Sequence, residues 1–264
     1  PSIHHQSLIT NHKLLHWSLV FVTAVIAGGI NSVAGGGSLL TFPTLIWLGV
    51  PSINANATNT VAIWPGTLGS VWAYRRELKG VDPRVYALIV PSVVGGGAGA
   101  VLLRLTPPGV FDVIVPVLVG FATFLFMIQE PLQRRFNWTV GHKARSHWLS
   151  WTMFYQLLVG LYGGYFGAGI GILMLAALSL MGHTDILQMN GLKNLLATWI
   201  NAVAAIYFMV AGLVFWGDAI VMAIGTIIGG VGGAMLARRM DRDAVRRVVI
   251  VIGFTLALSL MLRL

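Results

Sequence analysis

The sequence of 264 residues contains no cysteine. Disulfides, cysteine-ligated zinc or iron–sulfur sites and thiol catalysis are therefore excluded. Charge is also scarce, because 9% of the residues are charged and 56% are hydrophobic, whereas a soluble domain carries roughly 25% charged residues. The mean hydropathy is +0.81. This composition predicts an all-α polytopic membrane protein with most of the chain in the bilayer, where helices satisfy their own backbone polar groups.

Carboxylates are missing from the middle of the apolar segments, since all eight Asp and Glu residues lie near segment ends. A carboxylate proton relay or a cation site is therefore poorly supported, and the absence favours an anionic substrate. His12 and His16 are four residues apart, but no third ligand accompanies them, and we expect no metal and no cofactor. An intramembrane enzyme with Ser38 as nucleophile would need a base that no mid-membrane histidine supplies. We therefore expect a protein that is not an enzyme.

The basic residues indicate orientation rather than a nucleic-acid partner, although the net charge is +9. Thirteen of the 17 Lys and Arg residues fall between residues 75–84, 134–145 and 238–247, and Lys13, Arg104 and Arg263 fall at the opposite segment ends. Basic loops stay in the cytoplasm and face anionic lipid headgroups. This asymmetry places both termini outside, with the lipid bilayer as the partner.

Apolar segments define the domain organisation. A polar N-terminal tail (1–13) precedes a first transmembrane repeat (14–128), a basic cytoplasmic linker (129–147) and a second repeat (148–264). The ten segments are 14–30, 38–48, 57–74, 83–103 and 108–128 in the first repeat, and 148–166, 170–181, 192–210, 216–237 and 244–262 in the second. The second and seventh are too short to cross a core of about 30 Å at about 1.5 Å per residue.

Glycine clusters precede both short segments, at Gly35-Gly36-Gly37 and at Gly163-Gly164 through Gly167, Gly169 and Gly171. Successive glycines weaken a helix. Non-helical backbone at membrane depth survives only inside protein or beside a water-filled cavity. We therefore predict short broken or re-entrant helices that line a site.

The chain is an internal duplication. Asn59, Ala62 and Trp64 coincide with Asn194, Ala197 and Trp199, and the glycines at 95–99 match those at 229–233, at offsets that drift only from 132 to 135. Each half has an odd number of segments, so the two five-segment repeats should be inverted, and paired interrupted segments point to a transporter's binding site. The small-residue spacing of Gly95/Gly99 and Gly229/Gly233 predicts close helix packing.

Lys193 is the one basic residue outside the loops and segment ends, and it starts an otherwise apolar predicted helix. A buried cation at a helix N-terminus would form an anion site. The alternative is that Lys193 pairs with Asp185 or reaches the surface. Thr58 holds the matching position in the first half, and we expect it to bind the substrate as well.

Amide and hydroxyl side chains cluster at the breaks: Asn31, Ser32, Ser38, Asn59, Asn194 and Asn201. They could bind a substrate or form hydrogen bonds between helices, and open glycine backbone could offer N–H groups to an oxyanion. Trp64 and Trp199, related by the repeat, either pack structurally or form a wall of the site.

The two breaks and their flanks resemble the TauE/SafE sulfite-exporter family, also described as the toluenesulfonate-uptake permease family. The resemblance runs over nearly the whole chain and is carried by Asn31 to Ser38, Phe42-Pro43, Asn56 to Thr60, Gly163 to Gly171 and Lys193-Asn194. It implies export of sulfite, sulfoacetate or a related organosulfur anion across a bacterial inner membrane. It points to a site formed by Asn31, Gly35, Gly36, Gly37, Ser38, Asn59, Gly167, Gly169, Lys193 and Asn194.

For this site we expect alternating access by the two inverted halves around one small anion. An anion channel and an importer using the same residues stay open as alternatives, and so does a homodimer.

Overall fold

The computed structural model describes residues 3–33, 35–136, 148–181 and 185–236, and residues 250–262 except 252, 256 and 260. These residues are helical and contain no strand. In chain order the elements are α1 (Ile3–Val33), α2 (Ser38–Trp47), α3 (Ser52–Ala73), the 3-10 helix η1 (Pro83–Leu88), α4 (Ile89–Leu105), α5 (Pro108–Phe136), α6 (Trp148–Tyr165), α7 (Ile170–Leu180), α8 (Ile186–Val210) and α9 (Trp216–Leu236). Further helical residues follow between 250 and 261.

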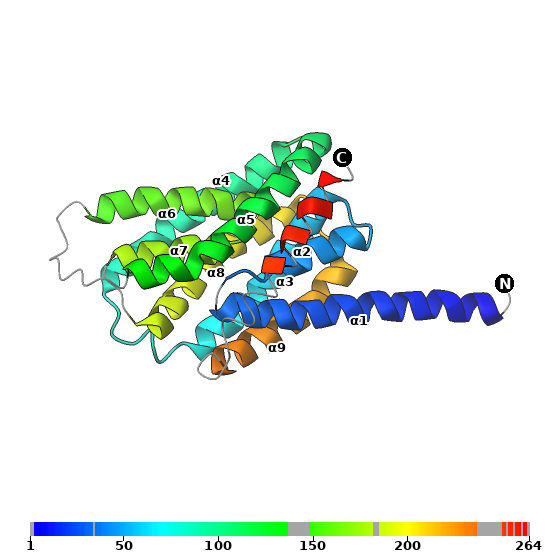
Figure 1. Cartoon of the computed structure of the whole chain (residues 1–264), viewed down its shortest axis with the longest axis horizontal. Helices are drawn as coiled ribbons and strands as arrows, with labels where there is room; N and C mark the ends of the chain where they lie inside the picture. The colour runs from blue at the N-terminus through cyan, green and yellow to red at the C-terminus, as the bar shows by residue number, and fades with distance from the viewer. Residues whose placement is uncertain are drawn as a thin grey trace.

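Five stretches of the described chain are long and apolar enough to span a membrane: Leu14–Ser32, Pro83–Leu105, Pro108–Leu125, Ile186–Val210 and Trp216–Met235. The prediction of an all-α multi-pass protein is confirmed at this level. Several boundaries differ from the prediction. Helix α3 begins at Ser52 rather than at residue 57, and α5 continues to Phe136, into the predicted linker. Residues 3–13, assigned to a polar tail, are helical and continue α1, which extends beyond the other helices in Figure 1. Helix α8 begins at Ile186 rather than at residue 192.

Both glycine clusters interrupt the helices, as predicted. Gly35 has a φ of 89°, and Gly167 and Gly169 have φ values of 80° and 81°. These left-handed conformations favour glycine because it has no Cβ. At the first break α1 ends at Val33 and α2 begins at Ser38. At the second break α6 ends at Tyr165 and α7 begins at Ile170.

The chain reverses direction at the second break, so α7 returns along α6. Tyr162 donates its hydroxyl to the Ala168 carbonyl at 2.8 Å, and Tyr155 donates to the Leu173 carbonyl at 3.1 Å. At the first break the Gly37 N–H donates to Asn31 Oδ1 at 2.8 Å, which ties the start of α2 to the last turns of α1. Each short helix therefore forms a hairpin-like unit with the long helix before it.

Helices of one half pack against helices of the other. Helix α9 lies along α1 and α3, whereas α4 lies along α6 and α8, and α3 contacts α8 at the centre (Figure 1). Glycines permit the closest crossings, as the small-residue spacing predicts. A Cβ on Gly229 would overlap the Val25 carbonyl of α1, and a Cβ on Gly99 would overlap the Leu161 carbonyl of α6.

Residue contacts fix the relative directions of these helices. His16 meets Asp218 and Gly29 meets Gly233, so α1 and α9 run the same way. Gln156 bonds Ser92 and Gly164 meets Gly99, so α4 and α6 also run the same way. In contrast, α3 and α8 run in opposite directions, because Thr67 bonds Thr198 while Tyr74 meets Gly191.

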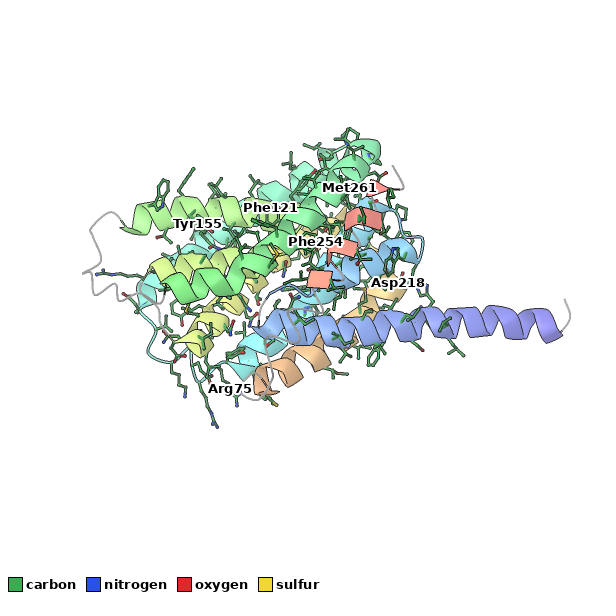
Figure 2. All side chains as sticks on the ribbon, viewed as in Figure 1. Arg75, Phe121, Tyr155, Asp218, Phe254 and Met261 are labelled. Carbon is green, nitrogen blue, oxygen red and sulfur yellow. The ribbon has the colours of Figure 1, made fainter. Side chains whose placement is uncertain are left out.

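An open groove lies on the outside of the molecule between α5 and residues 254–261. Its lining is entirely apolar and includes Phe121, Phe254 and Met261, which lie near one another in Figure 2. None of the described residues in its wall has a polar side chain that would bind an anion.

Candidate functional site

The two breaks lie against each other in the interior. A Cβ on Gly35, in the first break, would come within 2.8 Å of Gly171 Cα at the start of α7. Phe42 of α2 and Phe166 of the second break pack edge to face, with ring centroids 5.3 Å apart. Such a pair stabilises the contact beyond its buried area. The chain thus brings both irregular segments to one place.

A polar cavity of about 30 Å³ opens at this meeting point. Eight of the predicted site residues line it: Asn31, Gly35, Ser38, Asn59, Gly167, Lys193, Asn194 and Asn201. They come from α1, α2, α3, α8 and the two breaks. The prediction that Asn59 and Lys193 lie at one cavity is therefore in agreement with the structure.

Other lining residues were missed by the sequence reading. They include Thr60, Ile63 and Thr67 of α3, Ala197 of α8, Phe166 of the second break and Ile170 and Gly171 of α7. Helical spacing could have identified several of them. Positions three or four residues apart share one helix face. If Asn59 and Asn194 line the cavity, Ile63 and Ala197 are therefore expected to line it too.

Lys193 is almost fully buried, with 1% of its surface exposed. Its ammonium donates to the Asn31 carbonyl at 2.9 Å and to the Ser32 carbonyl at 3.2 Å. The last four carbonyls of a helix lack partners within the helix, and a cation at that end also meets the negative end of the helix dipole. Lys193 therefore caps α1 while it lines the cavity.

Two sequence interpretations of Lys193 are wrong. Lys193 does not lie at a helix N-terminus, because α8 begins seven residues earlier and its N-cap is Asp185. Asp185 instead accepts N–H groups of its own first turn, from Leu187 at 2.9 Å and Gln188 at 3.4 Å. The burial of Lys193 also excludes the alternative that it reaches the surface.

The amides of Asn31 and Asn59 are oriented by the hydrogen bonds of their oxygens. Asn31 Oδ1 accepts the Gly37 N–H at 2.8 Å, and Asn59 Oδ1 accepts the Thr41 hydroxyl at 2.5 Å. No described residue bonds either NH₂ group, so those donors are what the two residues offer the cavity. The amide of Asn194 has the opposite orientation, because its NH₂ group, and not its oxygen, is bonded: it donates to the Ser32 carbonyl at 3.1 Å.

Three of the glycine N–H groups at the breaks are already bonded, so only part of the glycine backbone could serve as open donors. The N–H of Gly35 bonds the Ile30 carbonyl at 3.1 Å, and the N–H of Gly167 bonds the Tyr162 carbonyl at 3.2 Å. Gly37 is also engaged, with Asn31. These three N–H groups are therefore not free to bind an anion in the cavity.

The N-terminal ends of both short helices face the cavity. Ser38 is the first residue of α2, Ile170 and Gly171 begin α7, and all three line the cavity. Helix N-termini carry partial positive charge and favour anions. None of the described residues that line the cavity is a carboxylate, so their electrostatics favour negative charge.

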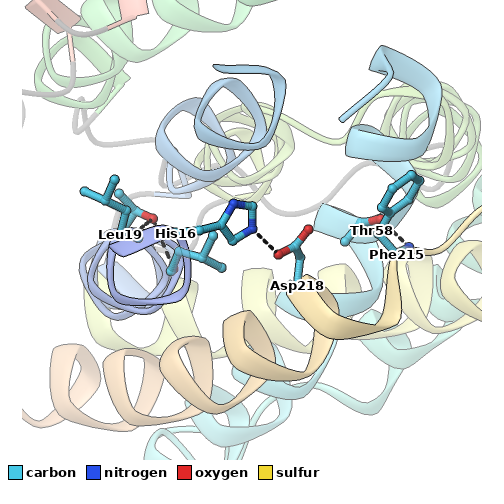
Figure 3. A network of polar contacts seen from close by, with 7 residues as sticks. His16, Leu19, Thr58, Phe215 and Asp218 are labelled. Carbon is cyan, nitrogen blue, oxygen red and sulfur yellow. Dashed lines mark hydrogen bonds and ion pairs between the residues drawn. The ribbon is translucent and has the colours of Figure 1, made fainter. Parts of the chain in front are cut away.

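Thr58, a predicted binding residue, lies away from the cavity. Figure 3 shows its hydroxyl accepting the Phe215 N–H, at 3.0 Å, beside the ion pair of His16 and Asp218. Thr58 therefore joins α3 to the segment before α9, where Asn54 also donates to the Leu213 carbonyl at 2.9 Å.

The remaining predicted residues support the cavity without lining it. Ser32 contributes the carbonyl that Lys193 and Asn194 bond. Gly36 and Gly37 form the turn into α2, and Gly169 packs on Ala122 of α5. Neither tryptophan is a wall of the site: Trp64 packs with Val61, Ala205 and Ala219, and Trp199 is 43% exposed.

Comparisons with known proteins agree with this architecture. A family model described as "Sulfite exporter TauE/SafE" matches residues 20–260. The probable membrane transporter protein YfcA of Escherichia coli strain K12 is 25% identical over 244 residues, which cover 92% of this chain and 88% of the relative. A probable membrane transporter protein of Haemophilus influenzae is 26% identical over 242 residues, covering 90% and 91%. No solved structure matches the chain significantly.

Proposed function

The chain belongs to the sulfite exporter TauE/SafE family of membrane transporters, and from that premise we propose that it exports sulfite or a related small organosulfur anion from the bacterial cell. The observation that carries the substrate class is the set of donors around the cavity. The NH₂ groups of Asn31 and Asn59 and the ammonium of Lys193 come together there, with no carboxylate among them.

This donor set suits an oxyanion because several oxygens can each accept a hydrogen bond in place of water. Hydrogen bonds between a charged group and a donor are roughly twice as strong as neutral ones. The N-terminal ends of α2 and α7 add fixed positive potential, the arrangement by which interrupted transporter helices address anionic groups. A cation would meet the same potential unfavourably.

Inversion of the two halves is part of the proposal, and the packing supports it. Under the repeat, α1 corresponds to α6, α3 to α8 and α4 to α9. The contact between α1 and α9 then corresponds to the contact between α6 and α4. The repeat maps the antiparallel contact between α3 and α8 onto itself. Because α3 and its counterpart α8 run in opposite directions, the packing supports an inverted relation of the two halves.

The size of the cavity favours alternating access over a continuous pore. A cavity of about 30 Å³ has room for roughly one or two water molecules. Admitting a larger oxyanion requires the surrounding helices to separate on one side. The inverted halves could open to one side of the membrane at a time by moving relative to each other around the site.

Export is the direction that the membrane potential favours for an anion, given a negative cell interior. The potential contributes about 2.3 kcal/mol per charge per 100 mV. On the proposed topology in the inner membrane, the basic loops lie in the cytoplasm and both termini lie outside.

Sulfite flux in liposomes containing the purified protein tests the proposal. Lys193→Met should lower the flux roughly tenfold or more, because it removes a charged hydrogen-bond donor. Lys79→Met, in an exposed turn, is the matched control and should transport normally. Undiminished flux in the Lys193 variant would remove Lys193 from the site, large unitary currents would identify a channel, and absence of flux for every sulfur oxyanion would refute the substrate class.

A further inference from the structure

Asn190 of α8 is completely buried, and neither the nitrogen nor the oxygen of its amide has a hydrogen-bond partner among the described residues. An amide that is unbonded at both ends in a dry interior is unfavourable. Asn190 precedes Lys193 by three residues and Asn194 by four, so the three side chains share one face of α8. That face meets the end of α1, where Ser32 Oγ is also buried without a described partner.

The other half shows what an asparagine at this level can do. Asn56 precedes Asn59 by three residues, one turn before the asparagine that the repeat shares with Asn194. Its NH₂ group bonds the Tyr165 carbonyl, the last residue of α6, at 2.8 Å. Asn56 thus caps the broken helix of the second half. At the end of α1, the equivalent carbonyls are bonded by Lys193 and Asn194 instead.

We propose that Asn190 is the alternative cap of α1, which takes over the Asn31 carbonyl when the Lys193 ammonium turns to the bound anion, while Asn194 keeps its bond to the Ser32 carbonyl. This inference rests on the proposed anion site. In the present arrangement the ammonium bonds both carbonyls and the Asn190 amide is unbonded. In the exchanged arrangement Asn190 bonds a carbonyl and the ammonium bonds the anion.

The exchange explains how the buried Lys193 ammonium can leave the carbonyls of α1 without leaving them unbonded. Turning Lys193 away would otherwise leave the Asn31 carbonyl without its side-chain donor in the membrane interior, which is unfavourable, whereas the Ser32 carbonyl keeps the bond from Asn194. Asn190 lies one turn from Lys193 on the same face of α8, so in the proposed exchange its amide replaces the lost bond. Asn190 is therefore a positioning residue for the anion-bound state.

A double-mutant cycle between Asn190→Leu and Lys193→Met tests the exchange. The quantity measured is the thermal midpoint of the detergent-solubilised protein without ligand. In the wild-type background Asn190→Leu should raise the midpoint, because it removes unbonded polar atoms. In the Lys193→Met background Asn190 already caps α1, so the same substitution should lower the midpoint. Asn190→Ala should show the same difference between backgrounds if leucine does not fit.

Equal effects of the Asn190 variants in both backgrounds would overturn the proposal, since independent sites give additive changes. Asn56→Leu is the control. It breaks a bond already present and should lower the midpoint in both backgrounds.

The transport arm uses sulfite as the probe. Asn190→Leu should weaken the apparent affinity roughly fivefold, the effect of about one hydrogen bond. Asn190→Gln, which keeps an NH₂ donor, should restore part of it. An unchanged affinity in Asn190→Leu would overturn the role in anion binding. If the wild type carried no oxyanion, the proposed function would fail, whereas the cycle would still decide whether Asn190 replaces Lys193.

Discussion

Single residues at the breaks have two tasks, and the sequence reading separated what the structure combines. Asn194 was a candidate either for substrate binding or for hydrogen bonds between helices, and Lys193 either for anion binding or for pairing with Asp185 or reaching the surface. Lys193 lines the cavity and also bonds the carbonyls at the end of α1. A transmembrane helix that ends inside the membrane needs donors for its last carbonyls. Polar residues at a break are therefore required before any substrate is considered.

Asn59 allows the donor hypothesis to be tested with little change in shape. Asn59→Asp keeps the oxygen that accepts the Thr41 hydroxyl but replaces the NH₂ donor by a carboxylate oxygen that repels an anion. We expect sulfite flux in liposomes to fall roughly tenfold or more, consistent with losing a hydrogen bond to a charged group.

The control is Asn54→Asp, the same substitution on the same helix outside the cavity. It loses a hydrogen bond to the Leu213 carbonyl and should lower the thermal midpoint more than the flux. Normal flux in the Asn59 variant would show that its NH₂ group does not contact the substrate.

At the scale of helices, glycine clusters and run lengths predicted the interruptions well. A segment of 10 or 11 residues, as in α2 and α7, is too short to span a bilayer whatever its environment. The start of α8 could not be located from hydropathy, because its first two turns contain Gln188, Asn190 and Gly191. These polar residues are tolerated since they lie against other helices, a fact of tertiary packing that a hydropathy window does not contain.

Glycine contacts between α1 and α9 give a prediction at the same scale. Alanine in place of an exposed helical glycine stabilises a helix by about 0.5–1 kcal/mol. Gly229→Ala should instead destabilise the protein by about 1–3 kcal/mol, because its Cβ would overlap the Val25 carbonyl. Gly232→Ala, on the same helix with no atom within 4 Å of its Cβ, is the matched control and should be neutral or stabilising. Thermal midpoints in detergent measure both, and equal effects would contradict close packing of α1 on α9.

For the whole molecule, the duplication was visible in the sequence. What was not visible is that each central helix caps the broken helix of the other half. The offset of 132 to 135 residues aligned Asn59 with Asn194 and so located both central helices. It could not show that α8 caps α1 while α3 caps α6, because these contacts depend on how the halves interleave. For the same reason the backbone N–H groups of Gly35 and Gly167 were wrongly taken as open donors, since the carbonyls that bind them become apparent only in the folded breaks.

The inverted arrangement can be tested on the cysteine-free chain, which gives thiol labelling no background. Lys79 lies just before η1 and α4, and Gly217 lies at the start of α9, the helix that corresponds to α4; both are exposed. If the repeats are inverted, these two positions lie on opposite sides of the membrane.

In intact cells, a membrane-impermeant maleimide should label Gly217→Cys and should label Lys79→Cys only after permeabilisation, because the basic turn at 75–84 is expected in the cytoplasm. Labelling of both positions from the same side would indicate a parallel repeat, in which related helices begin on one side. That result would also conflict with the opposite directions of α3 and α8, because helices related by a parallel repeat run the same way.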